Sequence, residues 1–354
     1  MELRNNIFDA VKALAIWLVV LGHCVQYLSG VDYWNDRLFQ FIYSFHMPLF
    51  FMISGFFFAS SAKLGWWEFL SKKALTLLLP CFVWGIVDAI MYFDSWSQLC
   101  ANILLPTHWP FWFFKGLFLV QVFVYVIMRL TARIEGGANI RVCSLILLSL
   151  LVYAMPYMAV PRVMLPIFWI GYVMKMKYEW FVTYHRAIGI GALLLFAGLY
   201  YFWNGETMHY SASASVTIYH VLLGKHGYTG LNLLMLGYRI LLGASGSVAI
   251  IAAMHEIKSV HKYIGIIGAS TAGIYILQTY ILQKGMGGLF ERYVNLSAWP
   301  MACNYILMAA ISVVLTIIKT WIYQVLKKSQ MIDMLLFGNG EMIKRIVNKK
   351  TEEK

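Results

Sequence analysis

The sequence predicts an all-α protein, a polytopic membrane helical bundle of about ten transmembrane helices with both termini in the cytosol. Three observations lead to this prediction. Of the 354 residues, 61% are apolar and only 12% are charged, whereas soluble domains contain roughly 25% charged residues. Apolar windows of about twenty residues recur along the chain. Basic residues lie in short clusters between these windows, which is typical of the loops that connect membrane helices.

The apolar windows predict ten spans, at residues 8–28, 38–60, 74–94, 110–130, 142–158, 162–176, 186–203, 231–254, 263–283 and 303–326. With the N-terminus in the cytosol, twenty of the 28 Lys and Arg residues lie in inside segments and six in outside segments, which supports this orientation. The fifth and sixth spans are short, and they form either two spans or one re-entrant pair.

These spans predict one transmembrane domain over residues 1–326 and a basic cytosolic tail over residues 327–354. No small-residue cleavage site follows the first apolar run, so we interpret this run as an anchored helix and not as a removed signal peptide.

The composition also excludes several classes of function. The net charge of +12 is distributed between the spans, so the basic residues indicate a lipid bilayer as partner and no nucleic acid. The five cysteines show no spacing that is typical of a metal site. We find no GxGxxG, Walker, HExxH or GxSxG motif.

Three ionisable residues interrupt the first apolar span: Asp9, Lys12 and His23. Such residues are expensive in hydrocarbon and are interpreted first as functional. On a helix, Lys12 and His23 differ by about 20° in azimuth and about 16 Å in depth, so they share one face. This arrangement suits a long anionic ligand that enters from the cytosol, with Asp9 close enough to pair with Lys12. Alternatively, Lys12 snorkels to the headgroups and His23 is a packing residue.

The second span contains His46, Pro48, Ser54 and Gly55. Pro48 removes a backbone donor and should bend the helix, while Gly55 lets another backbone approach closely. In this topology His23 and His46 lie at comparable depths, where two imidazoles could flank a reaction centre. The alternative is that each imidazole bonds a backbone carbonyl.

Two further segments combine basic and aromatic residues. Lys72 and Lys73 follow a tryptophan pair, and such a segment either anchors the helix at the interface or holds the phosphates of a cytosolic ligand. The second segment contains His108, Trp109, Trp112 and Lys115. It forms either an aromatic belt or a set of flat platforms for a sugar, with His108 and Lys115 as hydrogen-bonding groups.

Two basic residues lie within predicted spans. Arg239 is some eight residues below the outer surface, where it needs an acidic partner or an anionic ligand. Lys319 is expected to snorkel towards the inner surface.

Several segments, in this order, resemble the acyltransferase-3 family of bacterial membrane proteins. They are Asp9-x2-Lys12-x10-His23, the run FHMPLFFMISGF at 45–56, Trp112-Phe113-Phe114-x2-Leu117, Phe168-x2-Gly171-Tyr172 and Gly268-Ala-Ser270-Thr-Ala-Gly273-Ile-Tyr275-Ile-Leu277. The family's best-known motif has arginine where this chain has Lys12, as in the branch that resembles exopolysaccharide and fucose acetylases. The family's Arg-x-x-Arg motif is absent, and Lys72 and Lys73 are its nearest substitutes. Gln278 stands where the family often has histidine.

The resemblance implies an enzyme of the bacterial cytoplasmic membrane that transfers an acyl group, usually acetyl, to a hydroxyl of a surface polysaccharide or related glycan. Its donor would be acetyl-CoA or another acyl-CoA, with no tightly bound cofactor. The acceptor would be a glycan or lipid-linked sugar, and polysaccharide-assembly proteins are expected as further partners.

The residues suggest a mechanism for such a transfer. Lys12, Lys72 and Lys73 would lie near the phosphates of acyl-CoA. His23 would act as general base or transient acyl carrier. A donor to the developing oxyanion would come from Arg239, His46 or Ser54.

Two other classes of function remain open at this point. A transporter of a glycan or anion could use the same buried basic residues, although such a protein is expected to show internal repeats and we detect none. The other class is a structural subunit of a polysaccharide-assembly machine, in which the same residues serve only packing.

Overall fold

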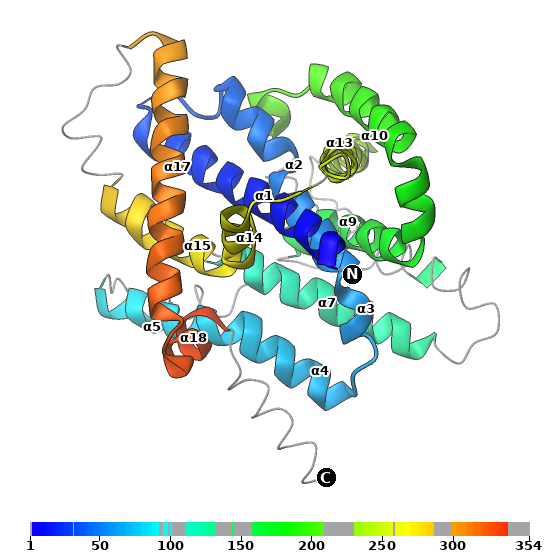
Figure 1. Ribbon diagram of the computed structural model, residues 1–354, viewed down its shortest axis with the longest axis horizontal. Coiled ribbons are helices and arrows are strands. Elements are labelled where there is room, and N and C mark those ends of the chain that lie inside the picture. The colour runs from blue at the N-terminus through cyan, green and yellow to red at the C-terminus, as the bar shows by residue number, and fades with distance from the viewer. Residues whose placement is uncertain are drawn as a thin grey trace. The chain divides into compact units, whose positions relative to one another are not determined.

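The computed structural model describes residues 2–338 except 31, 92–94, 98–99, 101–110, 132–142, 145–157, 209–229, 258 and 287–298. The described residues form helices and no strands (Figure 1), which confirms the predicted all-α class. The helices are α1 (Glu2–Leu28), α2 (Arg37–Phe56), α3 (Phe58–Ser61), α4 (Trp66–Lys73), η1 (Ala74–Leu78), α5 (Leu79–Met91), α7 (Trp112–Leu130), α9 (Ala159–Met176), α10 (Tyr178–Tyr201), α13 (Gly230–Met254), α14 (Lys262–Ala269), α15 (Thr271–Gln278), η2 (Thr279–Met286), α17 (Met301–Leu326) and α18 (Gln330–Phe337). The elements η1 and η2 are π-helical.

Within the described residues, seven helices are long and apolar enough to cross a membrane, or eight if the bent pair α14 and α15–η2 counts as one span. They correspond to eight of the ten predicted spans. The predicted span 142–158 lies almost entirely outside the described residues. The predicted span 162–176 is helical as α9, but α9 is not among the seven helices. The polytopic membrane class is therefore confirmed.

The chain divides into two compact units. The first comprises Met1–Ile53, Met176–Ser213 and Met235–Val325, and the second comprises Ser54–Lys175, Ala214–Leu234 and Leu326–Lys354. Most of α2, α13 and α17 belongs to the first unit, together with α1, α10, α14, α15 and η2.

Helix α1 is the central element of the first unit. In its apolar window 72% of the residues are buried, against 6% in α10 and 28% in α17. Its core residues, such as Phe8, Val11 and Val20, are fully buried. The helix packs against α14, α15 and η2 (Figure 1). The segment that carries the candidate residues is thus held by other protein elements over most of its length.

The close crossing of α1 and α14 depends on a glycine. A Cβ atom added to Gly268 would lie 2.0 Å from the backbone oxygen of Asp9, so only glycine allows the two backbones to approach this closely. After Gly268 the chain bends by 61° between α14 and α15. Ser270 lies at the bend, where its hydroxyl donates to the carbonyl of Ile266 and accepts from Gln324.

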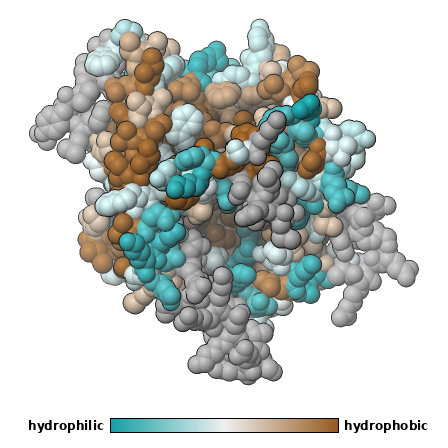
Figure 2. Space-filling model, viewed as in Figure 1, coloured by the Kyte–Doolittle hydropathy of each residue, from teal (hydrophilic) through white to brown (hydrophobic). Residues whose placement is uncertain are grey.

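Helices α10 and α17 form apolar outer surfaces of the first unit. On α17 the side chains of Ile306, Val314, Ile317 and Trp321 are more than half exposed, and much of this helix is brown in Figure 2. In water such a surface would be unfavourable, whereas it is suited to contact with lipid chains.

In the second unit, α4, η1 and α5 follow one another without interruption. The ring of Phe69 stacks on Tyr125 of α7, with centroids 3.9 Å apart. Helix α18 packs against α5 and η1, and its last carbonyls lie near Trp84, whose indole donates to Leu336. A Cβ atom on Gly55 would lie 1.8 Å from the carbonyl oxygen of Phe168, which confirms that Gly55 permits a close backbone approach.

The α1–α14 crossing gives the first testable prediction. Replacing Gly268 with alanine should lower the free energy of unfolding by about 1–3 kcal/mol, because one backbone must move away. The matched control is Gly265→Ala on the same helix, where an added Cβ meets nothing within 4 Å. This control should be neutral or slightly stabilising, since alanine favours a helix. Thermal unfolding of both variants in detergent measures the difference in stability. Equal melting temperatures would contradict the close backbone contact of α1 and α14 at Gly268.

Candidate active site

His23 lies on the accessible face of α1. Its imidazole, Gln26 and Tyr27 are partly exposed, while the neighbouring Cys24 and Val25 are fully buried. The three residues share a face because side chains three and four positions apart on a helix are neighbours. As a residue, His23 is therefore only partly buried among the described residues.

The hydrogen bonds of His23 fix which nitrogen carries the proton. Nδ1 lies 3.0 Å from the side-chain oxygen of Gln26, and an amide oxygen can only accept. Nδ1 therefore donates, which leaves the lone pair on Nε2. Tyr43 also donates to this oxygen of Gln26, at 3.4 Å. The amide nitrogen of Gln283, in η2, lies 3.4 Å from both ring nitrogens. A neutral imidazole in this state can accept a proton or attack a carbonyl carbon.

The second histidine, His46, is near His23 through a shared aromatic ring. The ring of Tyr43 lies 6.4 Å from the ring of His23 and 4.6 Å from that of His46. His46 is buried, and its Nδ1 donates to the carbonyl of Ile42 at 2.7 Å. This bond to a backbone carbonyl is the packing alternative that the sequence left open for His46.

Asp9 and Lys12 form the ion pair that their spacing predicts. The Lys12 nitrogen lies 2.5 Å from the Asp9 carboxylate, and each side chain is 27% exposed. The pair is therefore partly accessible, near the first turns of the helix that also carries His23. A surface pair of this kind adds little stability, so it leaves the lysine available to an anionic ligand.

Arg239 replaces the backbone donor that Pro48 lacks. Pro48 cannot donate to the carbonyl of Ser44, four residues earlier in α2. The guanidinium of Arg239 donates to this carbonyl at 3.0 Å and to the carbonyl of Tyr43 at 2.6 Å. It also lies 4.8 Å from the ring centroid of Trp203. Sequence reasoning expected an acidic partner or an anionic ligand, and the partners in the structure are backbone carbonyls.

The remaining candidates belong to the second unit. Ser54 lies in the last turn of α2, and Lys72 and Lys73 end α4, where all three are partly exposed. Their predicted roles rest on the sequence alone.

The aromatic stretch is described only in part. His108 and Trp109 lie outside the described residues. Trp112 begins α7, and Lys115 is buried in its first turn, so this lysine is not in an exposed loop. The preceding residue, Phe111, has a positive φ of 68°, a conformation that costs a non-glycine residue about 1–2 kcal/mol.

Sequence reasoning missed Gln26 and Gln283 and gave Lys319 the wrong environment. The spacing of His23 and Gln26, three residues on one helix, was a readable signal for their contact. Gln283 carried no such signal, because it is 260 residues away in the chain. Lys319 does not snorkel: it is fully buried in α17, and its ammonium donates to the side-chain oxygen of Gln278.

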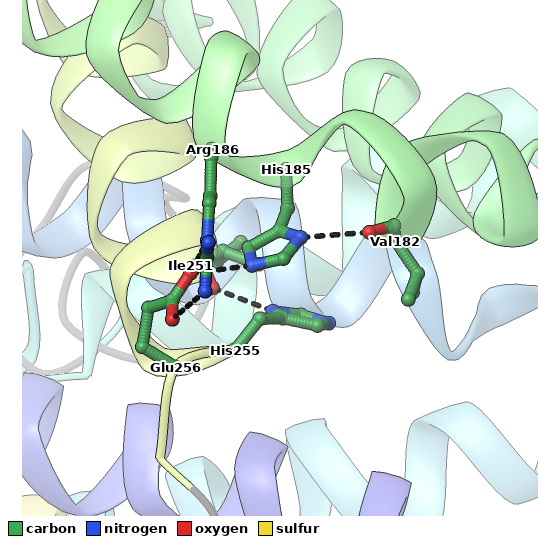
Figure 3. A network of polar contacts seen from close by, with 6 residues as sticks. All are labelled: Val182, His185, Arg186, Ile251, His255 and Glu256. Atoms are coloured by element: carbon green, nitrogen blue, oxygen red, sulfur yellow. Dashed lines mark hydrogen bonds and ion pairs between the residues drawn. The ribbon is translucent and has the colours of Figure 1, made fainter.

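A polar network that the sequence did not indicate joins the ends of α10 and α13 (Figure 3). Arg186 holds the carboxylate of Glu256 through two hydrogen bonds, of 2.7 and 2.9 Å. His185 lies between two acceptors, the carbonyl of Val182 and the carboxylate of Glu256, each at 2.7 Å.

The hydrogen bonds from Arg186 and His185 lower the pKa of Glu256 to about 2. His255 completes the network with a donated bond to Ile251 and an accepted bond from Tyr178. Burial lowers the pKa of His255, which favours the neutral form of its ring. It contacts Phe8 of α1, with centroids 6.3 Å apart, and the network thus supports the start of the helix that carries Asp9.

Comparisons with known proteins agree with this architecture. The family model described as "Acyltransferase domain" matches residues 5–321. This chain belongs to the acyltransferase-3 family, and its long apolar helices are those of a multi-pass membrane protein.

Two relatives carry the name nodulation protein NolL. The chain is 29% identical to the protein from Mesorhizobium japonicum over an alignment of 227 residues, with 59% of each chain covered. It is 27% identical to the protein from Sinorhizobium fredii over an alignment of 190 residues, with 50% of each chain covered. The matched segments thus span between half and three fifths of these relatives. No solved structure matches the chain.

The role of Arg239 predicts that the stability lost on replacing it depends on the presence of Pro48. Arg239→Met should lower the free energy of unfolding by about 1–3 kcal/mol, because two carbonyls lose their donors. In the double variant with Pro48→Ala, the loss of unfolding free energy should be smaller than the sum of the losses in the two single variants by about 1 kcal/mol. The reason is that alanine restores the helical donor to the carbonyl of Ser44. Tyr238→Phe is the control, because Tyr238 donates to Leu199 and not to α2. Additive effects of Arg239→Met and Pro48→Ala in thermal unfolding would refute this role.

The lowered pKa of Glu256 predicts a dependence of stability on pH. The carboxylate's usual pKa is 4.5 and its pKa here is about 2. The stability that the ionised carboxylate contributes to the fold is therefore fully present above pH 4.5 and is lost as the pH falls towards 2. The difference in melting temperature between the wild type and Glu256→Gln should be constant from pH 5.5 to 7 and shrink below about pH 4.5. A difference that grows on acidification would contradict the assignment.

Proposed function

We propose that this protein transfers an acyl group, most simply acetyl, from acyl-CoA to a hydroxyl group of a glycan, and that His23 is the group at which the transfer takes place. The observation that carries the proposal is the setting of His23: it is partly accessible, its Nδ1 is bonded to Gln26, and the amide nitrogen of Gln283 lies 3.4 Å from Nε2. Family membership favours a transferase over a transporter or an assembly subunit.

The donor end of the site is proposed to lie along α1. Lys12 is partly accessible and lies near the start of the helix that carries His23. A lysine there can attract the phosphates of a CoA ester, while the length of the CoA arm lets the thioester reach a deeper imidazole. The proposed acyl-CoA is a substrate and not a resident cofactor.

The acceptor is proposed to be a polysaccharide or lipid-linked sugar. The sequence resemblance supports this class, and two relatives are nodulation proteins of bacteria. We accordingly propose that the protein acts in the cytoplasmic membrane of a bacterium, alongside proteins that assemble the glycan.

The test is a transfer assay on the purified protein. Acetyl-CoA and a panel of mono- and oligosaccharides are incubated with the wild type, and release of free thiol and acetylation of the sugar are followed. His23→Ala should lower the rate by about 10²–10⁴-fold, the usual contribution of a general base. The control is His261→Ala, which removes an exposed histidine. A His23→Ala variant with wild-type activity would refute the proposal.

The same assay distinguishes the two chemical roles of His23. If the imidazole carries the acyl group, mixing the protein with acetyl-CoA in the absence of a sugar should release one thiol per protein in a rapid burst. If the imidazole is a general base, thiol release should require the sugar.

A further inference from the structure

Lys319 is a buried cation inside a membrane span. It lies within α17 with no exposed surface, and its ammonium donates to the side-chain oxygen of Gln278. Among the described residues, no carboxylate lies within ion-pair distance of it. An ammonium has three donors, and one amide oxygen does not compensate for the loss of water around a charge. A buried residue with these properties in a membrane helix indicates a functional site.

The amide of Gln278 has a donor to spare beside this ammonium. Gln278 is 1% exposed, and its side-chain nitrogen has no hydrogen-bond partner. Because its oxygen is occupied by Lys319, the nitrogen is the atom that remains available. Two sets of donors, the ammonium and the amide, therefore lie next to each other.

These donors belong to the surroundings of His23. Five residues after Gln278 along the chain, η2 carries Gln283, whose amide nitrogen lies 3.4 Å from the imidazole. The oxygen of this amide is buried and also lacks a partner. The elements that carry these two glutamines, α15 and η2, both pack against α1, the helix of His23. Unpaired buried polar atoms are rare in folded proteins. Here two of them lie on the short segment 278–283, which contacts Lys319 at its first residue and His23 at its last.

We propose that Lys319 and Gln278 bind the carbonyl oxygen of the acyl thioester beside His23 and stabilise the negative charge that this oxygen acquires during transfer. This inference rests on the transferase function proposed above and makes both residues catalytic. It assigns the oxyanion donors to side chains that have unfilled hydrogen-bonding capacity. Arg239 and His46, which the sequence suggested for this task, donate to backbone carbonyls instead.

The chemical step balances as follows. Nε2 of His23 accepts the proton of the sugar hydroxyl while the hydroxyl oxygen attacks the thioester carbon. The electron pair of the carbonyl bond moves to the oxygen, where the Lys319 ammonium and the Gln278 amide donate to it. When the carbonyl re-forms, the carbon–sulfur bond breaks, and the CoA thiolate takes the proton from the imidazolium. The products are the acetylated sugar and free CoA thiol.

The decisive variant is Gln278→Glu. It gives Lys319 a carboxylate partner of nearly the same shape. If Lys319 has only a structural role, the variant protein should therefore be as stable as the wild type or more stable. A carboxylate at this position would repel the developing oxyanion and neutralise the ammonium, so the proposal expects kcat to fall by about 10²–10³-fold, as for loss of an oxyanion donor. The affinity for free CoA should change by less than about threefold. Free CoA has no acyl carbonyl, and in the proposal this carbonyl is the only part of the donor that Gln278 contacts.

Lys319→Met tests the cation directly, because methionine keeps an unbranched chain but has no donor. Its kcat should also fall by about 10²-fold or more. The matched control is Thr320→Val on the same helix, where the hydroxyl donates only to the carbonyl of Thr316, at 2.7 Å. Size-exclusion profiles and melting temperatures of all variants establish that the proteins are folded. If Lys319→Met does not fold, Gln278→Glu alone decides.

The outcomes separate the two proposals. A wild-type protein that releases no thiol from acetyl-CoA with any sugar overturns the transferase function and this inference with it. An active wild type together with a Gln278→Glu variant whose kcat is within threefold of Thr320→Val overturns only the inference. An active wild type and a variant with lowered kcat but unchanged CoA binding supports both.

Discussion

Every polar group inside an apolar helix bundle must find its partner within the protein, and this constraint shapes the first unit. In hydrocarbon no water is available to replace a missing bond. Pro48 is tolerated within α2 because Arg239 donates to the carbonyl that the proline leaves free. His46 likewise bonds the backbone of its own helix. Among the buried atoms that break this rule, those of Gln278 and Gln283 lie on the segment beside His23, and another belongs to Asn304.

Helix α1 joins the parts of the candidate site. Its buried face is fixed by α14, α15 and η2, and Gly268 brings one of these helices against its backbone at Asp9. Its partly exposed face presents His23 together with Gln26. Because one rigid helix carries Lys12 and His23, the distance between an anchoring cation and the imidazole is set by helix geometry and does not depend on loops.

Local contacts were predictable from the sequence, and distant ones were not. The Asp9–Lys12 pair follows from a spacing of three residues on a helix, and Gly55 indicates a close backbone approach because it has no side chain. In contrast, the contact of Arg239 with Ser44 spans 195 residues, and that of Lys319 with Gln278 spans 41. A lysine near the end of a membrane helix usually snorkels, so nothing in the sequence pattern distinguished Lys319 from the usual case.

The sequence by itself determined that the chain is a helical membrane protein, which residues lie on the face of α1, and, through its motifs, the acyltransferase-3 family. These properties depend on composition and on spacings within single helices, which the periodicity of a helix translates directly into positions. Only the tertiary structure decided the distant surroundings of His23: that Gln283 approaches from η2 and that Lys319 is buried. The physical reason is that the partner of a buried polar group is set by how helices pack, and packing brings together residues whose separation in sequence carries no signal.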